Sequence, residues 1–286
     1  MPELPEVETI RRDLHQHLVG DRLRKVTLKR PDIVCGDPGA FLSAVSGRQV
    51  TDTGRHGKAM WLCLEDDIAL GVHLRMTGRL LLVEKRHELP PHTHMLAELG
   101  GGGRLIYVDP RRFGRLELLD LARLDAATIL QNMGPDALSQ ELSASELRAA
   151  AAGHSVAIKQ FLLDQSHLAG IGNIYASEIL HRVGLHPATP ANRVTSEEMG
   201  EILDATRQVF QEAIEARGTT LTDAQYRTGL GETGGYQRRL RVYGNAGKRC
   251  AVPGCVGIIR RCELGQRSTY FCPLCQARGR GRRAGS

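Results

Sequence analysis

Four cysteines near the end of the 286-residue chain have the spacing of metal ligands. Cys250 and Cys255 form a C-x4-C pair, and after sixteen intervening residues Cys272 and Cys275 form a C-x2-C pair. Each short spacer turns two thiolates toward one ion, and four thiolates make the closed tetrahedral site typical of structural zinc. Such a site leaves no open position for catalysis. We therefore predict one structural Zn²⁺ that stabilises a small ribbon of strands.

A second group able to do chemistry lies at the other end of the chain. Pro2 follows Met1, and a small second residue permits removal of the initiator methionine, which would expose a secondary amine. An α-amino group is partly neutral near pH 7, and a neutral amine can attack a sugar C1′ to form an iminium. Glu3 and Glu6 are the nearby carboxylates that could move protons. Chemistry alone leaves open the alternative that Pro2 and Pro5 only shape the start of a helix.

The charge distribution points to a polyanionic partner. Residues 237–286 contain twelve Lys and Arg against one acid, so this segment carries +11, and the rest of the chain carries −5 of the net +6. Nucleic acid is the commonest partner of such a basic segment. Gly170 and Gly172 precede a predicted helix that Asn173 would cap, so backbone N–H groups could approach a phosphate there. An ordinary tight turn remains the alternative at this place.

The elements that must position these groups follow a clear order. Apolar residues at helical spacing, with Gly20 as a stop, predict a helix over residues 5–19. Segments rich in β-formers, separated by Gly-containing turns, predict a β-sandwich or barrel behind it. The expected strands are 25–30, 49–53, 59–65, 69–76, 80–84, 96–99, 105–108 and 115–119. The spacing then becomes helical, with expected helices at 126–132, 144–152, 156–165, 174–183 and 196–216.

The predicted fold class is therefore α+β and multidomain. We expect an N-terminal helix plus β-sandwich over residues 1–124, a helical domain over 125–245, and the four-cysteine zinc ribbon with a basic tail over 246–286. No apolar run approaches the roughly 20 residues that span a bilayer. The acidic, proline-broken N-terminus does not resemble a secretory signal. These features predict a cytoplasmic protein with no membrane partner.

Four motifs, in this order, carry a family resemblance. They are Pro-Glu-Leu-Pro-Glu-Val-Glu-Thr at 2–9, Asp-Pro-Arg-Arg-Phe-Gly at 109–114, Ala-Gly-Ile-Gly-Asn-Ile-Tyr-Ala-Ser-Glu at 169–178, and the four-cysteine ribbon. Together they span nearly the whole chain. The sequence resembles the formamidopyrimidine-DNA glycosylases of the helix-two-turns-helix superfamily. The resemblance implies the same domain order, with a helix-two-turns-helix domain between the sandwich and the ribbon.

The resemblance also implies an activity and a set of catalytic residues. Members of the family are DNA glycosylases and abasic-site lyases that remove oxidised purines, chiefly 8-oxoguanine opposite cytosine and formamidopyrimidines. Pro2 matches the nucleophile that forms the Schiff base, Glu3 the general acid/base, and Glu6 a supporting carboxylate. Lys58 matches a lysine that contacts phosphate at the lesion and assists catalysis. Both phosphates are then eliminated, which leaves a one-nucleotide gap. No redox cofactor is expected.

Several other positions match DNA contacts of the family. Met76, Arg111 and Phe113 correspond to the three side chains that enter the duplex after the damaged nucleotide is flipped out, and without the resemblance Met76 and Phe113 would be taken for core residues. His92 matches a DNA-contacting histidine. The phosphates around the lesion are expected to contact Lys159, Asn173 and Arg267.

Residues 218–243 resemble the lesion-recognition loop of the family. Thr219, Thr220 and Tyr236 are possible contacts to the flipped base or its phosphate. Arg217 departs from the pattern, because many relatives have glycine there. Four glycines between 229 and 235 favour a mobile loop.

The expected partner is double-stranded DNA that contains oxidised bases, bound by a monomer in the bacterial cytoplasm and associated with the nucleoid. Two alternatives remain. One is an endonuclease VIII-like enzyme for oxidised pyrimidines, against which Leu4 and the complete 111–113 set argue. The other is a non-catalytic zinc-ribbon protein that binds DNA, in which Pro2 is only structural.

Overall fold

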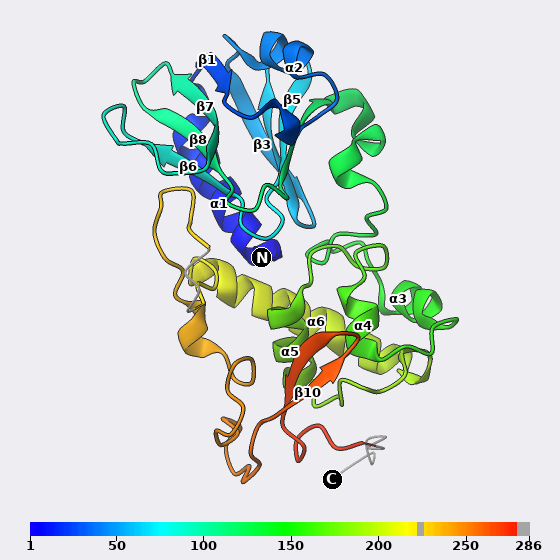
Figure 1. Cartoon of the computed structure of the whole chain (residues 1–286). Coiled ribbons are helices and arrows are strands. Elements are labelled where there is room, and N and C mark those ends of the chain that lie inside the picture. The colour runs from blue at the N-terminus through cyan, green and yellow to red at the C-terminus, as the bar shows by residue number, and fades with distance from the viewer. Residues whose placement is uncertain (222–225, 279–286) are drawn as a thin grey trace. The chain divides into compact units, whose positions relative to one another are not determined.

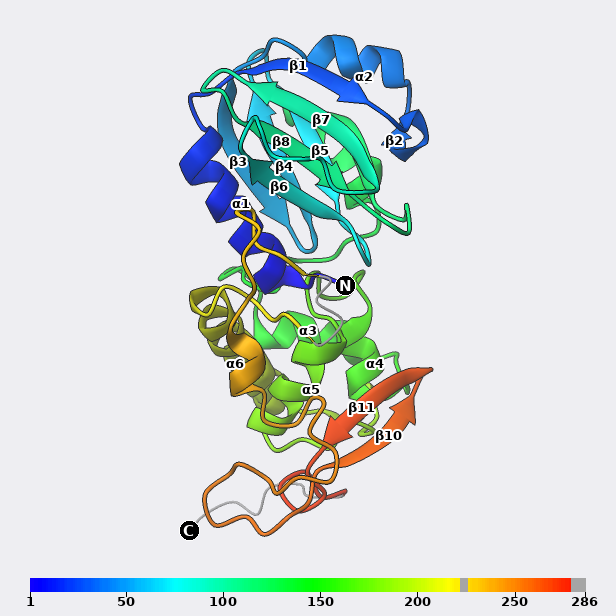
Figure 2. The ribbon, with the colours of Figure 1, turned by 60° about the vertical axis from the view of Figure 1, so that its left-hand side comes forward.

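The computed structural model describes residues 1–221 and 226–278. Its contacts divide the chain into two compact units (Figures 1 and 2). The first, called the N-terminal unit, comprises Met1–Asn132 and Ala213–Gln237. The second, called the helical unit, comprises Met133–Glu212 and the residues from Arg238 onward. The basic tail from residue 279 lies outside the described residues.

Helix α1, Leu4–Leu18, opens the N-terminal unit and confirms the first predicted helix. Glu3 is its N-cap, and the Glu3 backbone N–H donates to Glu6 Oε2 at 2.9 Å, which satisfies a donor that a helix start would leave unpaired. The buried apolar face of the helix lies against the sandwich core. Its members are Val7, Ile10, Leu14 and Leu18. The helix ends just before Gly20, whose φ of 90° suits glycine.

Two sheets form the predicted sandwich (Figure 2). The first has the order β1-β7-β8-β6, with β1 Leu23–Leu28, β7 Thr93–Leu99, β8 Arg104–Val108 and β6 Arg79–Val83. The second has the order β2-β9-β5-β4-β3, with β2 Val34–Cys35, β9 Arg115–Asp120, β5 Ile68–His73, β4 Ala59–Leu64 and β3 Val50–His56. One continuous core packs between them and includes Phe41, Met60, Val72, Met95 and Tyr107.

All eight strands predicted in this region are present, but some boundaries differ. Strand β5 ends at His73 rather than at Met76, because Arg75 has a φ of 51° that no extended strand allows. Strand β2, the 3₁₀ turn Pro31–Ile33 and helix α2, Pro38–Val45, were not predicted from the sequence, although Asp37 caps the start of α2. The predicted helix 126–132 is wrong. The Glu117 carboxylate binds the N–H groups of Thr128 and Ile129 and holds short 3₁₀ turns instead, Leu121–Ala126 and Thr128–Leu130.

The helical unit contains the remaining predicted helices. They are α3 Ala144–Ala151, α4 Ile158–Leu163, α5 Asn173–Arg182 and most of α6 Ser196–Glu215, with a 3₁₀ turn at Ala191–Arg193. A further 3₁₀ turn, Tyr236–Arg239, crosses the boundary between the two units. The C-terminal strands β10, Arg260–Leu264, and β11, Arg267–Phe271, form an antiparallel hairpin in the ribbon region. Among the described residues, no helix combines the length and the apolar character needed to cross a membrane.

The division by contacts differs from the predicted domain boundaries in one important place. Residues 213–237, which the sequence assigns to the helical domain, pack with the N-terminal unit. The Leu82 N–H of strand β6 donates to Gly229 O at 2.8 Å, and a Cβ on Gly229 would press on Asp13 of α1. Neighbours in sequence therefore do not define this unit. Contacts between segments far apart in the sequence, such as the Leu82–Gly229 hydrogen bond, define it.

The core of the N-terminal unit gives a test of this packing. Phe41 is 1% exposed and Phe113 is 47% exposed. Phe41→Ala should lower the free energy of unfolding by about 3–5 kcal/mol because it leaves a cavity. Phe113→Ala, the same chemical change on the surface, should change it by less than about 0.5 kcal/mol. Urea titration followed by the fluorescence of Trp61, the single tryptophan of the chain, reports on this unit. Similar losses in both variants would contradict the assigned core.

Candidate active site and nucleic-acid interface

The start of helix α1 holds the predicted nucleophile and its carboxylates. Pro2, Glu3 and Glu6 are all buried, while Met1 is 52% exposed. Glu6 uses both carboxylate oxygens: Oε2 accepts the Glu3 N–H, and Oε1 accepts the Thr219 N–H at 2.8 Å. Glu6 therefore joins the chain end to the 217–236 segment and orients the backbone that carries Pro2 and Glu3.

Lys58 lies in the turn between strands β3 and β4, against which α1 packs. Gly57 has a φ of 55°, a left-handed conformation that the tight turn requires. Lys58 is buried, and across the sheet its neighbour Ala59 pairs with His73. Burial, followed by the charges of Arg75 and Lys58, lowers the pKa of His73 to about 3. His73 is therefore neutral at pH 7, and its Nδ1 accepts the Arg75 N–H at 3.1 Å.

One buried carboxylate organises the two loops that carry the predicted duplex-entering side chains. Asp109 is fully buried and accepts hydrogen bonds from the Thr77 hydroxyl, the Arg111 N–H at 3.2 Å and the Gly114 N–H at 2.8 Å. Thr77 follows Met76, so Asp109 fixes both loops at once. At Gly114 a Cβ would clash with the Tyr107 hydroxyl, which makes glycine necessary there.

The side chains at the tips of these loops are exposed. Met76 is 39% exposed, and the Arg111 guanidinium lies 4.6 Å from the ring centroid of Phe113. An exposed methionine and an exposed phenylalanine in one pair of linked loops favour a binding surface over a core. His92, also exposed, accepts the Asp109 N–H through its carbonyl oxygen. The structure thus brings the loops that carry Met76, His92, Arg111 and Phe113 together around Asp109.

Left-handed backbone marks the same loops. Arg75, His92 and Arg112 have φ values of 51°, 65° and 57°, although none is glycine. Such conformations cost free energy and persist where the surrounding structure holds them. Arg75 directly precedes Met76, Arg112 lies between Arg111 and Phe113, and His92 binds the Asp109 N–H through its carbonyl oxygen.

The described part of the segment predicted to recognise the lesion is anchored to helix α1. Arg217 Nη2 lies 2.9 Å from both carboxylate oxygens of Asp13 and 3.0 Å from Glu232 Oε2. The Tyr226 hydroxyl donates to Arg217 O at 3.1 Å. Arg217 therefore forms ion pairs at the base of the segment. The prediction of a mobile loop did not anticipate this anchor.

The predicted contacts within this segment lie inward. Thr219, Thr220 and Tyr236 are all buried, with Tyr236 only 2% exposed. The Thr220 hydroxyl donates to Tyr226 O and accepts the Gly234 N–H. These hydrogen bonds of Thr220 join the two described parts of the segment to each other. Residues 222–225 of the predicted loop lie outside the described residues.

Of the three predicted phosphate contacts in the helical unit, Lys159 is buried and binds a second one, Asn173. Lys159 is 0% exposed, and its Nζ donates to Asn173 Oδ1 at 2.7 Å, to Ser268 O at 2.9 Å and to Thr269 Oγ1 at 2.9 Å. Asn173 Nδ2 also donates to Ser268 O. Asn173 is the first residue of α5 and Gly172 is the N-cap, so the expected side-chain cap at 173 is not present. Lys159 binds protein atoms in this arrangement.

Arg267 stands exposed at the start of β11, beside Gln266, which has a φ of 58°. Because Lys159 and Asn173 both hold Ser268 O, they fix the backbone next to Arg267. The predicted contacts Asn173 and Arg267 therefore lie on one hydrogen-bonded cluster, and Lys159 is its buried centre.

Glu178 is a residue that sequence reasoning missed. Its carboxylate, 3% exposed, accepts the N–H groups of Arg241, Val242 and Tyr243 at 2.8, 3.0 and 2.8 Å. Burial raises the pKa of Glu178, and these three hydrogen bonds oppose the rise. The acid belongs to the 169–178 motif, but its partners are more than sixty residues away, so spacing could not reveal them.

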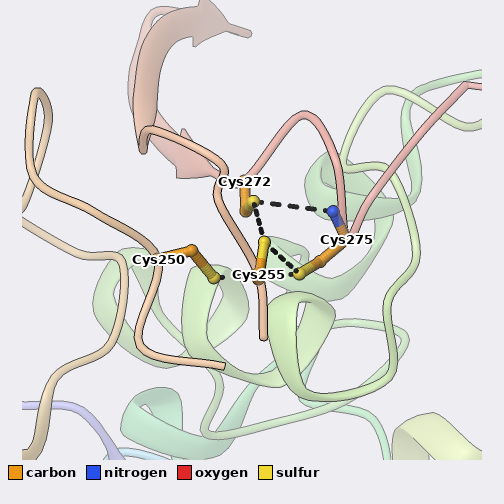
Figure 3. Close-up of side chains that lie close together, drawn as sticks. All are labelled: Cys250, Cys255, Cys272 and Cys275. Carbon is orange, nitrogen blue, oxygen red and sulfur yellow. Dashed lines mark hydrogen bonds between the residues drawn. The ribbon is translucent and has the colours of Figure 1, made fainter. Parts of the chain in front are cut away.

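The four predicted metal ligands converge in the helical unit, as Figure 3 shows. Their sulfur atoms all lie within 4.8 Å of one another. The pairs Cys250–Cys275 and Cys255–Cys272 are 3.7 Å apart, and Cys255–Cys275 is 3.4 Å apart. A tetrahedron with zinc–sulfur bonds of about 2.3 Å has edges of about 3.8 Å, whereas a disulfide needs about 2.0 Å. The donor set therefore fits zinc. His181 Nε2, 3.4 Å from Cys250 Sγ, supplies an outer hydrogen bond.

Comparison with known proteins identifies the family. Residues 1–116 match the formamidopyrimidine-DNA glycosylase N-terminal domain, and residues 133–225 match the formamidopyrimidine-DNA glycosylase H2TH domain. The chain belongs to the formamidopyrimidine-DNA glycosylase family. It is similar to the formamidopyrimidine-DNA glycosylases of Chloroflexus aurantiacus, at 41% identity over 96% of this chain and 98% of the relative, and of Heliobacterium modesticaldum, at 42% identity over 96% and 100%.

Solved structures of the family agree with the fold. The MutM (Fpg) protein of Thermus thermophilus superposes with a TM-score of 0.85 at 38% identity, covering 96% of this chain and 98% of that one. Lactococcus lactis Fpg, solved with DNA that contains an abasic site, gives a TM-score of 0.88 at 30% identity, covering 96% and 99%. The family resemblance and the α+β multidomain fold are thereby confirmed.

The neutral state of His73 predicts a dependence of stability on pH. The pKa of His73 is about 3 in the folded chain and about 6.5 in an unfolded one, so the unfolded state binds the proton first. Stability should therefore fall as the pH is lowered from about 6.5 toward about 3. His73→Gln removes this pH-dependent contribution. In urea titrations followed by Trp61 fluorescence, the difference in the free energy of unfolding between the parent and His73→Gln should shrink as the pH is lowered from about 6.5 toward about 3. The exposed His87→Gln serves as the control. Parallel pH curves for His73→Gln and the parent would contradict the assignment.

Proposed function

We propose that this chain is a base-excision-repair DNA glycosylase and abasic-site lyase that removes oxidised purines from duplex DNA through a Schiff base on Pro2. The observation that carries the proposal is the start of α1, where Pro2 and Glu3 are held by Glu6 in a chain of this family. Lactococcus lactis Fpg has been solved with DNA containing Fapy-dG and with DNA containing an abasic site. These ligands favour oxidised-purine and abasic substrates for this chain as well.

The arrangement around Asp109 suits the first step, flipping of the damaged nucleotide. An enzyme that acts on a base in a duplex must fill the space that the base leaves. Met76 and Phe113 are exposed apolar side chains that can enter the stack, and Arg111 beside Phe113 can hydrogen-bond the unpaired cytosine. His92 on the neighbouring loop is placed for a further contact. Asp109 keeps both loops in place while they distort the DNA.

The chemistry that follows belongs to the chain end. After removal of Met1, the lone pair of the Pro2 nitrogen forms a bond to C1′, the bond from C1′ to the base breaks, and the base leaves with the electron pair and a proton. Loss of the amine proton and opening of the sugar at O4′, which takes up a proton, give the iminium. Glu3, next in the chain, is the group that moves these protons. The iminium acidifies C2′–H, so the 3′ phosphate and then the 5′ phosphate are eliminated.

Phosphates near the lesion need fixed donors. We assign this task to Lys58 in the N-terminal unit and to Asn173 and Arg267 in the helical unit. Lys159 is given a different role from the one that the resemblance suggests. Since its ammonium is fully buried among Asn173, Ser268 and Thr269, it positions the two phosphate contacts and does not touch phosphate itself.

Zinc in the four-cysteine site would hold the ribbon and do no chemistry, because four thiolates complete its coordination. The ribbon carries Arg267, so the metal supports DNA binding indirectly. No redox cofactor enters the proposed reaction. One lesion needs one copy of each motif, which favours a monomer bound to double-stranded DNA.

Borohydride trapping tests the proposed nucleophile. On a duplex with 8-oxoguanine opposite cytosine, reduction should freeze an adduct that mass spectrometry places on Pro2, and Pro2→Gly, in which a primary amine replaces the secondary amine, should trap much more slowly. Pro31→Gly, at an exposed proline, is the matched control and should trap normally. Glu3→Gln should lose base excision more than cleavage at a preformed abasic site. Trapping only on thymine glycol would make the chain a pyrimidine-repair enzyme, and trapping on neither duplex would leave a DNA-binding protein.

Metal content tests the ribbon. The purified chain should hold one zinc per molecule by elemental analysis, and Cys255→Ser should lose it together with about tenfold or more of the affinity for an abasic-analogue duplex. Cys262→Ser, on β10 of the same ribbon but outside the cluster, should keep both. Full affinity of the metal-free Cys255→Ser chain would show that the ribbon does not contribute to binding.

A further inference from the structure

Glu8 on helix α1 lies at the centre of an arginine cluster that the proposed mechanism does not use. Its Oε1 accepts from Arg11 Nη2 at 2.9 Å and from Arg12 Nε at 2.8 Å, and its Oε2 accepts from Arg11 Nε at 2.9 Å and Arg55 Nε at 3.2 Å. Burial alone would raise the pKa of Glu8, but the arginine hydrogen bonds and charges lower it to about 2. Glu8 is thus a permanent anion at neutral pH.

The three arginines differ in what else they bind. Arg12 is half exposed and, among the described residues, its side chain bonds only to Glu8 on the same helix. Arg11 Nη1 donates to Thr53 Oγ1 at 2.9 Å, in strand β3. Arg55, whose side chain is 10% exposed, donates through Nη1 to Gly57 O at 3.1 Å. Of these contacts, the one from Arg55 ends on the peptide that joins Gly57 to Lys58.

The contacts from Glu8 through Arg55 to Gly57 O join the helix that follows Pro2 to the turn that carries Lys58. Glu8 lies on the same short, capped helix whose first residues follow Pro2 and Glu3, so its carboxylate moves with the nucleophile. Gly57 adopts a left-handed φ of 55° in a two-residue turn, a conformation available to several turn types. A guanidinium that binds Glu8 with one nitrogen and Gly57 O with another fixes the orientation of that peptide, and therefore the start of the Lys58 side chain.

We infer that Glu8 and Arg55 are positioning residues that keep Lys58 at a fixed position relative to Pro2, so that phosphate binding and amine attack occur at the same sugar. The inference rests on the proposed function, because it assigns a partner to the proposed catalytic lysine. Neither residue touches the reacting atoms. Misplacement of a catalytic group by about 1 Å costs up to about 100-fold in rate, so the effect should be on rate more than on affinity.

The test compares two substitutions that each weaken one hydrogen bond to Glu8. Arg55→Lys keeps the charge, but a single ammonium without the guanidinium fork cannot bridge Glu8 and Gly57 O in the same way. Arg12→Lys is the matched control, since the hydrogen bond of Arg12 to Glu8 stays within helix α1. The rate constant for borohydride-trappable Schiff base on a preformed abasic site is measured under single turnover. Arg55→Lys should slow it about 10- to 100-fold while Kd for an abasic-analogue duplex changes less than about threefold, and Arg12→Lys should change neither.

A double-mutant cycle distinguishes an effect of Arg55 on the position of Lys58 from a general effect of Arg55 on the stability of the fold. If Arg55 acts through Lys58, then Arg55→Lys should cost nothing further in a Lys58→Ala background. Rate losses that multiply in the double variant, or a parent rate in Arg55→Lys, would overturn the inference. Glu8→Gln, which retains one carbonyl acceptor, provides a second variant with the same expected sign should Arg55→Lys unfold, as judged by Trp61 fluorescence. Absence of any trapping by the parent chain would instead overturn the proposed function.

Discussion

The proposed nucleophile Pro2 lies near the N-terminus, and chain ends are usually the least ordered part of a protein. In this molecule the Glu6 carboxylate provides the restraint. One oxygen closes the start of helix α1 through the Glu3 N–H, and the other binds the Thr219 N–H from a segment more than two hundred residues away. Because both oxygens are used within protein, Glu6 acts as a structural clamp at the site. The positions of Pro2 and Glu3 depend on it.

Buried charged groups recur as organisers elsewhere in the chain. Asp109 fixes the two loops with exposed Met76 and Phe113, and Glu178 binds three consecutive backbone N–H groups. The Lys159 ammonium donates hydrogen bonds to Asn173 Oδ1 and to Ser268 O. A buried charge is costly unless it is fully hydrogen-bonded, so each of these groups fixes its partners tightly. The exposed side chains that meet DNA in the proposed mechanism are each held by one of these buried groups or by its neighbours.

Residues of the same motif also differ in their burial. Arg111 and Arg267, which are proposed to contact DNA, are exposed, whereas Asp109, Lys159 and Glu178 of the same or nearby motifs are buried, as are the proposed substrate contacts Pro2, Glu3 and Lys58. A motif by itself does not distinguish these two groups. Lys159 shows the consequence, because its identity suits a phosphate contact while its burial assigns it to positioning. Tyr236, proposed as a contact to the flipped base, is likewise buried.

The sequence by itself determined the groups available for chemistry and most of the elements. Local spacing carries that information: the four cysteines, the proline at position 2, helix α1 and the eight predicted strands all follow from near neighbours. Only the tertiary structure decided which side chains contact one another. Arg55 meets Glu8 across 47 residues, Lys159 meets Thr269 across 110, and Arg217 meets Asp13 across 204. Side-chain burial and long-range pairing arise from how the elements pack, and no local pattern in one sequence encodes them.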